Sequence, residues 1–200
     1  MKSLIETGFY YISGHGRGWA FSPSDLQSRF SRQQADTLLS ALAAQGKIRR
    51  VARGVYEYPS YSELLGKTLS PDIDQVARAY ARKFGWRIEV SGNTALNLLG
   101  LSNQIPATYL YLSDGPSRSY DILGQTLEFK KSALKTIGFK YRESMLLVQA
   151  LKALGNSHVG AEVINKVKQQ FEPSQRAKIL RDTRGTTSWI YEVIKTVCQD

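Results

Sequence analysis

The sequence has few of the residues that bind metals or form disulfide bonds. Its 200 residues include a single cysteine, Cys198, and two histidines, His15 and His158, which lie far apart. One cysteine cannot form a disulfide within the chain, and this set of residues offers no spacing typical of a zinc site. We therefore expect no internal disulfide, no bound metal and no cofactor.

Long apolar runs are also missing. No stretch approaches the roughly 20 consecutive apolar residues that span a bilayer. The opening residues, MKSLIETGFYYISG, lack the apolar region and the cleavage site of a signal peptide. We expect a soluble, cytoplasmic protein with no membrane contact. The hydrophobic share of 42% is large enough to build a buried core.

Negative charge is scarce in one particular region. The formal net charge is +10, and between residues 29 and 53 only Asp36 opposes six basic residues, namely Arg29, Arg32, Lys47, Arg49, Arg50 and Arg53. Residues 61–137 are nearly balanced in charge, and a second basic cluster lies within 166–184. A local basic excess of this kind suits a polyanionic partner such as nucleic acid.

Residues 1–60 contain, in order, the elements of a winged helix-turn-helix domain. Apolar residues at helical spacing predict a helix over 3–12, and the sequence WAF at 19–21 predicts a short strand. Ser22 and Asp25 have the spacing of a capping box, so a short helix opened by a proline should follow. This order places a second, longer helix next.

The second helix is the candidate recognition helix. Ser31 and Gln34 form another capping box, and Gly46 provides a helix stop. One face is apolar and should be buried; it consists of Ala35, Leu38, Leu39 and Leu42. The opposite face carries the short polar side chains of Gln33, Thr37 and Ser40. An amide such as that of Gln33 can read the edge of a base.

A basic β-hairpin, KIRRVARGVYEYP at 47–59, follows at once and is the candidate wing. We predict that its arginines contact DNA phosphates. The predicted DNA-binding residues are therefore Ser31, Arg32, Gln33, Gln34, Thr37, Ser40, Arg49, Arg50 and Arg53. A winged helix can instead bind a protein partner, without DNA. The local excess of basic residues favours DNA, because a protein-binding wing does not need it.

The rest of the chain reads as a second domain over 68–200, after a boundary rich in Pro, Gly and Ser at 58–71. Helical and strand patterns are mixed over the first half of this domain. From residue 142 onward the patterns are helical. We expect an α+β fold: a winged helix-turn-helix followed by a mixed domain with a small sheet and C-terminal helices.

One pattern is typical of an enzyme. Asp114, Glu128 and Lys130 have the D…ExK order of metal-dependent nucleases, in which two acids hold a divalent ion and the lysine positions the attacking water. However, Asp before Gly is ordinary in turns, and alternating Glu and Lys are common on the solvent face of a strand. We therefore expect no enzymatic activity and keep the nuclease as the less favoured alternative.

Taken together, these segments resemble the AbiEi-like antitoxins of bacterial and archaeal type IV toxin–antitoxin systems. The resemblance rests on FSPSDL, SRQQADTLLSALAAQGKIRRVARGVYEYP, SGNTALNLLGLSNQIP, ATYLYLSDGPSR and LLVQALKALG, and it covers nearly the full length. It implies an N-terminal winged-helix DNA-binding domain and a larger C-terminal antitoxin domain. It also implies repression of the protein's own operon through promoter repeats, and a companion toxin that resembles nucleotidyltransferases.

Overall fold

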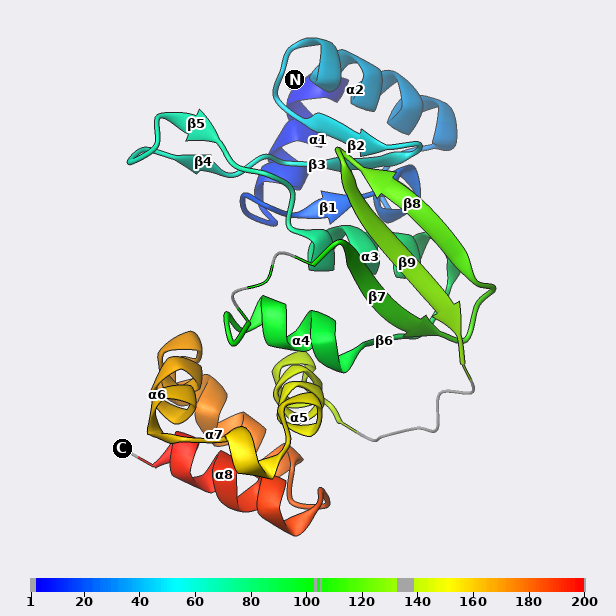
Figure 1. The fold of residues 1–200 in the computed structure, drawn as a ribbon. Coiled ribbons are helices and arrows are strands. Elements are labelled where there is room, and N and C mark those ends of the chain that lie inside the picture. Colours follow the sequence, from blue (N-terminus) through cyan, green and yellow to red (C-terminus); the bar gives the residue numbers. More distant parts are fainter. Residues whose placement is uncertain (1–2, 103, 105, 133–138, 200) are drawn as a thin grey trace. The chain divides into compact units, whose positions relative to one another are not determined.

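Helices and short strands are interleaved along the first two thirds of the chain, and helices follow to its end (Figure 1). The computed structural model describes residues 3–102, 104, 106–132 and 139–199. Its helices are α1 Leu4–Ser13, η1 Pro23–Leu26, α2 Arg32–Ala44, α3 Ile73–Phe84, α4 Gly92–Leu98, α5 Arg142–Leu154, η2 Asn156–His158, α6 Ala161–Gln170, α7 Pro173–Asp182 and α8 Ser188–Cys198. Its strands are β1 Ala20–Phe21, β2 Arg49–Ala52, β3 Val55–Glu57, β4 Tyr61–Ser62, β5 Lys67–Thr68, β6 Ile88–Val90, β7 Thr108–Ser113, β8 Arg118–Ile122 and β9 Gln125–Lys131. The predicted α+β class is confirmed.

The N-terminal elements follow the predicted order of a winged helix-turn-helix. Strands β1, β3 and β2 form an antiparallel sheet in that order, and the hairpin β2–β3 is the wing. Both predicted capping boxes are present, at Ser22 and at Ser31. The short element η1 is a 3₁₀ helix, because its four residues close hydrogen bonds three residues apart, as between Gln27 N–H and the Ser24 carbonyl.

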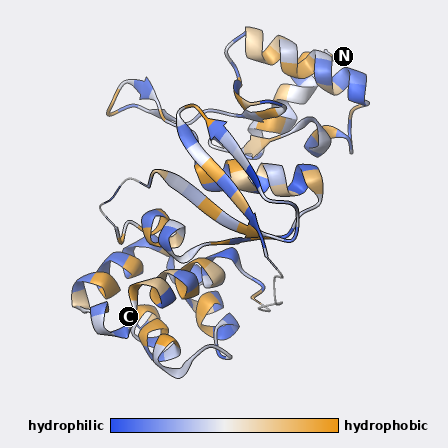
Figure 2. Cartoon of the chain, turned by 45° about the vertical axis from the view of Figure 1, so that its right-hand side comes forward, coloured by the Kyte–Doolittle hydropathy of each residue, from blue (hydrophilic) through white to orange (hydrophobic). Residues whose placement is uncertain are grey.

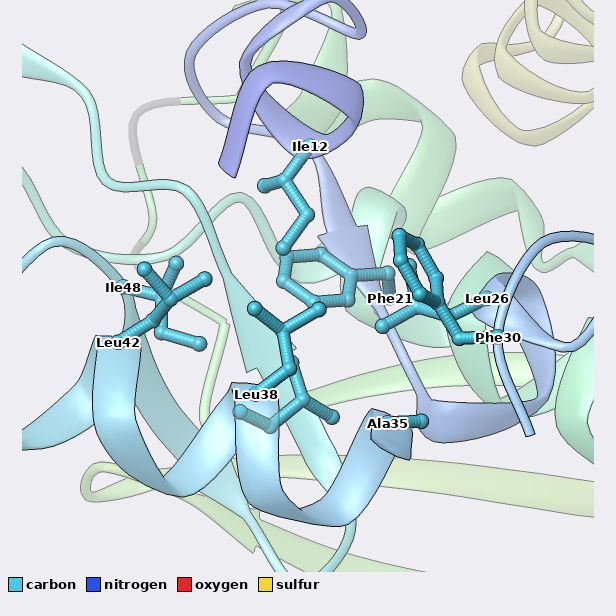
Figure 3. Packing of buried hydrophobic residues seen from close by; sticks show 9 residues of the cluster. Ile12, Phe21, Leu26, Phe30, Ala35, Leu38, Leu42 and Ile48 are labelled. Atoms are coloured by element: carbon cyan, nitrogen blue, oxygen red, sulfur yellow. The ribbon is translucent and has the colours of Figure 1, made fainter. Parts of the chain in front are cut away.

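A single apolar cluster holds α1, η1 and α2 against the sheet (Figure 3). The four predicted residues of the α2 stripe, Ala35, Leu38, Leu39 and Leu42, are all buried. They meet Ile12, Phe21, Leu26, Phe30 and Ile48 from the surrounding elements. Burial of each such leucine contributes roughly 2 kcal/mol. This packing leaves only the opposite face of α2 for solvent or for a partner.

The compact units differ from the predicted domain limits of 1–60 and 68–200. One unit comprises residues 1–88 and 118–127, and the other comprises 89–117 and 128–200. Helix α3 belongs to the first unit because it packs on β1, β3 and η1. From α3, Arg82 donates from Nε to Asp25 Oδ1 (2.6 Å) and from Nη2 to the Ala20 carbonyl (2.8 Å).

The segment 58–71, which the sequence presents as a boundary, contains a small hairpin. Strands β4 and β5 pair Tyr61 with Thr68 and Ser62 with Lys67, and the hairpin extends away from the rest of the N-terminal unit (Figure 1). Its turn carries Leu64, which is 95% exposed. Two residues per strand are too few to produce an alternating apolar pattern, so the sequence did not reveal this hairpin.

The remaining strands form a four-stranded sheet in the order β6-β7-β9-β8. Helices α5 to α8 each combine hydrophobic and hydrophilic residues (Figure 2) and bury their apolar sides on one another. Residues 103 and 105, which belong to the segment SGNTALNLLGLSNQIP at 91–106, lie outside the described residues. In the part of the chain that is described, no helix is long and apolar enough to cross a membrane.

A carboxylate from α7 caps the start of α5, which has no side-chain cap of its own. Asp182 accepts the backbone N–H of Lys140 at Oδ1 and that of Tyr141 at Oδ2, both at 3.0 Å. Burial raises the pKa of Asp182, but these donors outweigh it, and its net pKa lies below the ordinary value. The charged carboxylate is therefore the form that joins α7 to α5.

The close contact of α1 with α2 yields a test of this packing. A Cβ added to the buried Gly8 would lie 2.2 Å from Leu38 Cδ2. Alanine is the better helix former by about 1 kcal/mol, but the overlap in a filled core should outweigh this gain. We expect Gly8→Ala to lower the free energy of unfolding by about 1–2 kcal/mol in urea denaturation. Adding Leu38→Val should recover part of the loss, whereas a more stable Gly8→Ala protein would contradict the packing.

Candidate nucleic-acid interface

Helix α2 presents a continuous polar face. Gln33, Thr37 and Ser40, predicted to face outward, are exposed, as is Asp36 beside them. They lie opposite the buried stripe because side chains three and four residues apart share a helix face. The side chains are short, so the helix backbone can approach a flat or grooved partner closely.

Two predicted DNA contacts have a local structural role. Ser31 Oγ accepts the backbone N–H of Gln34 at 3.3 Å, and Gln34 Oε1 accepts the backbone N–H of Ser31 at 2.9 Å. This reciprocal pair satisfies two donors at the start of α2. Between them Arg32 is exposed at the first position of the helix. Ser31 and Gln34 therefore hold the first turn in place, and Arg32 is the side chain presented there.

The wing arginines do not share one face of the sheet. Arg50 pairs with Tyr56, which packs on the core beneath α1 and α2, whereas Arg49 pairs with the buried Glu57. Since successive strand residues point to opposite faces, Arg50 lies on the α2 side of the wing and Arg49 on the other. The prediction treated Arg49, Arg50 and Arg53 as equivalent, and the register separates them.

The Arg49 side chain is held by an ion pair and hydrogen bonds within the protein. Its Nε donates to Glu57 Oε1 at 2.6 Å, its Nη2 forms an ion pair with the same carboxylate, and Nη2 also donates to the Leu69 carbonyl at 2.8 Å. Burial raises the pKa of Glu57; the Arg49 guanidinium lowers it by less, and Asp72 raises it further. Arg49 thus compensates a buried carboxylate and ties the wing to the segment that leads into α3.

Other basic residues of the 29–53 segment lie over aromatic rings. The Arg29 guanidinium lies 5.0 Å from the centre of the Tyr11 ring, and Lys47 Nζ lies 5.1 Å from that of Phe9. Within the described residues, the side chains of Arg32, Arg50 and Arg53 make no hydrogen bond or ion pair, and all three are exposed. In the described part of the chain, these three arginines are the exposed cations of the segment that contact neither a carboxylate nor an aromatic ring.

Arg53 stands at the tip of the wing. Gly54 follows it with φ of +69°, a conformation that closes the hairpin turn and that other residues rarely adopt. The carbonyls of Arg53 and Gly54 both accept from Lys83 Nζ, at 3.2 and 3.4 Å. Burial, and then the neighbouring Arg53 charge, lower the pKa of Lys83. No sequence pattern indicates that Lys83, 30 residues further along the chain than Arg53, holds the wing turn.

The residues of the nuclease pattern lie on two elements of the C-terminal unit. Asp114 is exposed in the bend after β7, while Glu128 and Lys130 lie two residues apart on β9. The Ser113 hydroxyl accepts the Gly115 N–H at 3.0 Å, which is the local bonding of a turn. Among the described residues, no three or more His, Cys, Asp or Glu side chains come together as a metal site would require.

Comparison with known proteins identifies a family. A family model described as a family of unknown function, DUF6088, matches residues 11–179. The matched range contains β1, η1, α2, the wing and α3, and it continues into α7. No curated protein matches the chain. The match therefore covers the whole polar face of α2 and the wing, but it attaches no activity to them.

The opposite placements of Arg49 and Arg50 generate a prediction about stability. Arg49→Met would leave the carboxylate of Glu57 buried without its cation, and we expect the free energy of unfolding to fall by about 2 kcal/mol at neutral pH. Arg50→Met, the matched control on the next residue, should change it by less than about 0.5 kcal/mol. Urea denaturation measures both; equal effects of the two substitutions would contradict the register.

The stability lost in the Arg49→Met variant should depend on pH. The folded-state pKa of Glu57 is raised, so the folded protein binds this proton more tightly than the unfolded chain, and stability falls as the pH rises through that pKa. Without Arg49 the pKa should rise further. The gap in stability between Arg49→Met and wild type should therefore narrow as the pH is lowered and Glu57 is protonated. Adding Glu57→Gln should narrow the gap at neutral pH as well.

Proposed function

The chain belongs to the DUF6088 family, and we propose that it is a sequence-specific protein that binds double-stranded DNA. The observation that supports this most directly is the exposed polar face of α2, flanked on its own side of the sheet by Arg50. Recognition helices of helix-turn-helix proteins lie in the major groove and read bases with such side chains.

The proposed contacts divide into two kinds. Gln33 and Thr37 project from the centre of the outer face of α2, where they can bond base edges. Arg32 at the start of the helix and Arg50 on the wing flank that face, where they can contact phosphates. Base contacts of this kind confer specificity, while phosphate contacts confer affinity. Arg49 acts in this proposal as a positioning residue, because its guanidinium holds Glu57 and Leu69.

Charge favours DNA over a purely protein-binding winged helix. Within the described residues, Arg32 and Arg50 flank the polar face of α2 without a side-chain hydrogen bond or ion pair, and Arg53 stands at the wing tip, also without one. Exposed basic residues of this kind attract a polyanion. DNA phosphates supply that anion. A protein partner is the second candidate, and weak dependence of its binding on salt would distinguish it.

The biological role we propose follows the resemblance to AbiEi-like antitoxins. In this role the protein represses its own promoter and acts as the antitoxin of a nucleotidyltransferase-like toxin encoded beside it. This part of the proposal rests on the likeness of segments such as SRQQADTLLSALAAQG, and the family match neither adds to it nor opposes it. Co-expression with an adjacent nucleotidyltransferase-like gene tests it: relief of growth arrest supports the antitoxin role, and unrelieved arrest contradicts it.

The DNA proposal predicts two distinct mutant behaviours. Removing Arg32 and Arg50 together should weaken binding to all duplexes and reduce the slope of log K against log salt concentration by about two. Gln33→Ala should instead reduce preference for the protein's own upstream DNA over random duplex, by about 1–3 kcal/mol if Gln33 makes a good base contact. Fluorescence anisotropy at several salt concentrations measures both effects.

The control is Lys152→Ala, which removes an exposed positive charge from α5. It should leave DNA binding unchanged, because α5 is not part of the winged helix that carries the proposed contacts. If the double arginine variant binds as tightly as wild type, the wing and helix do not contact DNA. If wild type cleaves DNA with Mg²⁺ and Asp114→Ala does not, the nuclease alternative replaces the present one.

A further inference from the structure

A concavity of about 450 Å³ lies between the wing tip, the end of α3 and strand β8. All of its lining residues belong to the N-terminal unit: Ala52 and Arg53 of the wing, Tyr80, Lys83 and Phe84 of α3, and Arg118, Ser119, Tyr120 and Asp121 of β8. Its volume is within the range typical of small-molecule sites. The DNA-binding proposal makes no use of it, except through Arg53.

Positive charge dominates this concavity. Arg53, Lys83 and Arg118 line it against a single carboxylate, that of Asp121, whose Oδ1 accepts the Gly124 N–H at 3.3 Å. The Lys83 ammonium is partly buried and held at the wing carbonyls, and the charge of Arg53 disfavours its protonated form. Three cations brought together with one exposed acid repel one another. An anion between them would relieve that repulsion.

Aromatic rings form the other part of the wall. Tyr80 stacks on Tyr120 with ring centres 4.0 Å apart, and Phe84 stacks on Trp86 at 4.6 Å. Phe84 keeps 39% of its surface exposed. Lys83 Nζ and the Arg118 guanidinium lie 5.3 and 5.6 Å from the centre of its ring. An anion held by these two cations therefore lies beside the partly exposed Phe84 ring.

We propose that this concavity binds a free nucleotide, whose phosphate is held by Lys83, Arg118 and Arg53 and whose base contacts Phe84. Arginine is suited to phosphate through its planar set of donors, and bases stack on aromatic side chains with little dependence on their identity. The Ser119 hydroxyl and the Asp121 carboxylate stand in the same wall, where they can bond the sugar hydroxyls.

A phosphate of bound DNA could occupy the concavity in place of a free nucleotide. The geometry favours the free nucleotide. Glu57 and Arg49 lie on the sheet face that α3 approaches, whereas Arg50 and the polar face of α2 lie on the other side. The concavity is lined from α3 and so opens on the face of the wing away from α2. A duplex lying along α2 would have to pass around the wing tip to reach it.

Arg53 connects this site with the DNA interface. Its side chain stands at the wing tip and also lines the concavity. A phosphate bound there neutralises Arg53 and lowers the positive potential at the tip, so a bound nucleotide should weaken DNA binding. This coupling rests on the proposed DNA-binding function, whereas nucleotide binding itself does not.

The test measures the binding of adenosine and guanosine monophosphate and of inorganic phosphate to the full chain by calorimetry. We expect at least one mononucleotide to bind more tightly than inorganic phosphate. Arg118→Ala should weaken mononucleotide binding by roughly tenfold or more, since a charge-assisted hydrogen bond is lost. Phe84→Leu should weaken binding of the mononucleotide but not binding of inorganic phosphate, because it removes only the aromatic ring. Lys152→Ala is the matched charge control, and thermal unfolding verifies that each variant folds.

Several outcomes overturn the proposal. One is that no mononucleotide binds to wild type at millimolar concentration; another is that binding survives both Arg118→Ala and Phe84→Leu in folded protein. If Arg118→Ala weakens DNA binding as much as Arg50→Ala does, the concavity holds a DNA phosphate and the free-nucleotide assignment is wrong. If the nucleotide binds as expected but wild type binds no DNA, the site stands and the DNA-binding function fails, so the two failures are distinguishable.

Discussion

The two-residue period of a β-strand governs how this protein uses its positive charge. At the base of the wing, Arg49 and Arg50 are neighbours in sequence, yet the register with Glu57 and Tyr56 sends them to opposite faces of the sheet. One arginine neutralises a buried carboxylate, and the other remains exposed beside α2. A register shifted by one residue would leave Glu57 buried without a cation, so the ion pair also specifies the register.

Helix α3 covers the second face of the three-stranded sheet. It packs on β1 and β3. Its Arg82 donates a hydrogen bond to Asp25 of η1, and its Lys83 donates one to the Arg53 carbonyl at the wing turn. The wing is therefore held from behind by residues outside the sequence segment that forms it. A wing fastened in this way loses less conformational entropy when it meets a partner than a free hairpin would.

The basic residues of the N-terminal unit fall into distinct physical environments. Arg49 is paired, Arg29 and Lys47 lie over aromatic rings, and Arg32 and Arg50 are exposed near the polar face of α2. Arg53 lines the concavity with Lys83 and Arg118. A count of charges along the chain treats them all alike. They differ in their partners, and Arg50 and Arg53 lie on two sides of the wing.

The sequence is enough to predict the local elements: the capping box at Ser31, the buried stripe of α2 and its polar outer face all follow from residue type and helical period. It could not determine which wing arginine would be exposed, because that depends on the residue facing each one across the hairpin. Nor could it show that α3 belongs with the winged helix, or that Arg53, Lys83 and Arg118 meet. Those contacts join residues 30 and more positions apart, and only the packing of α3 and β8 against the wing brings them together.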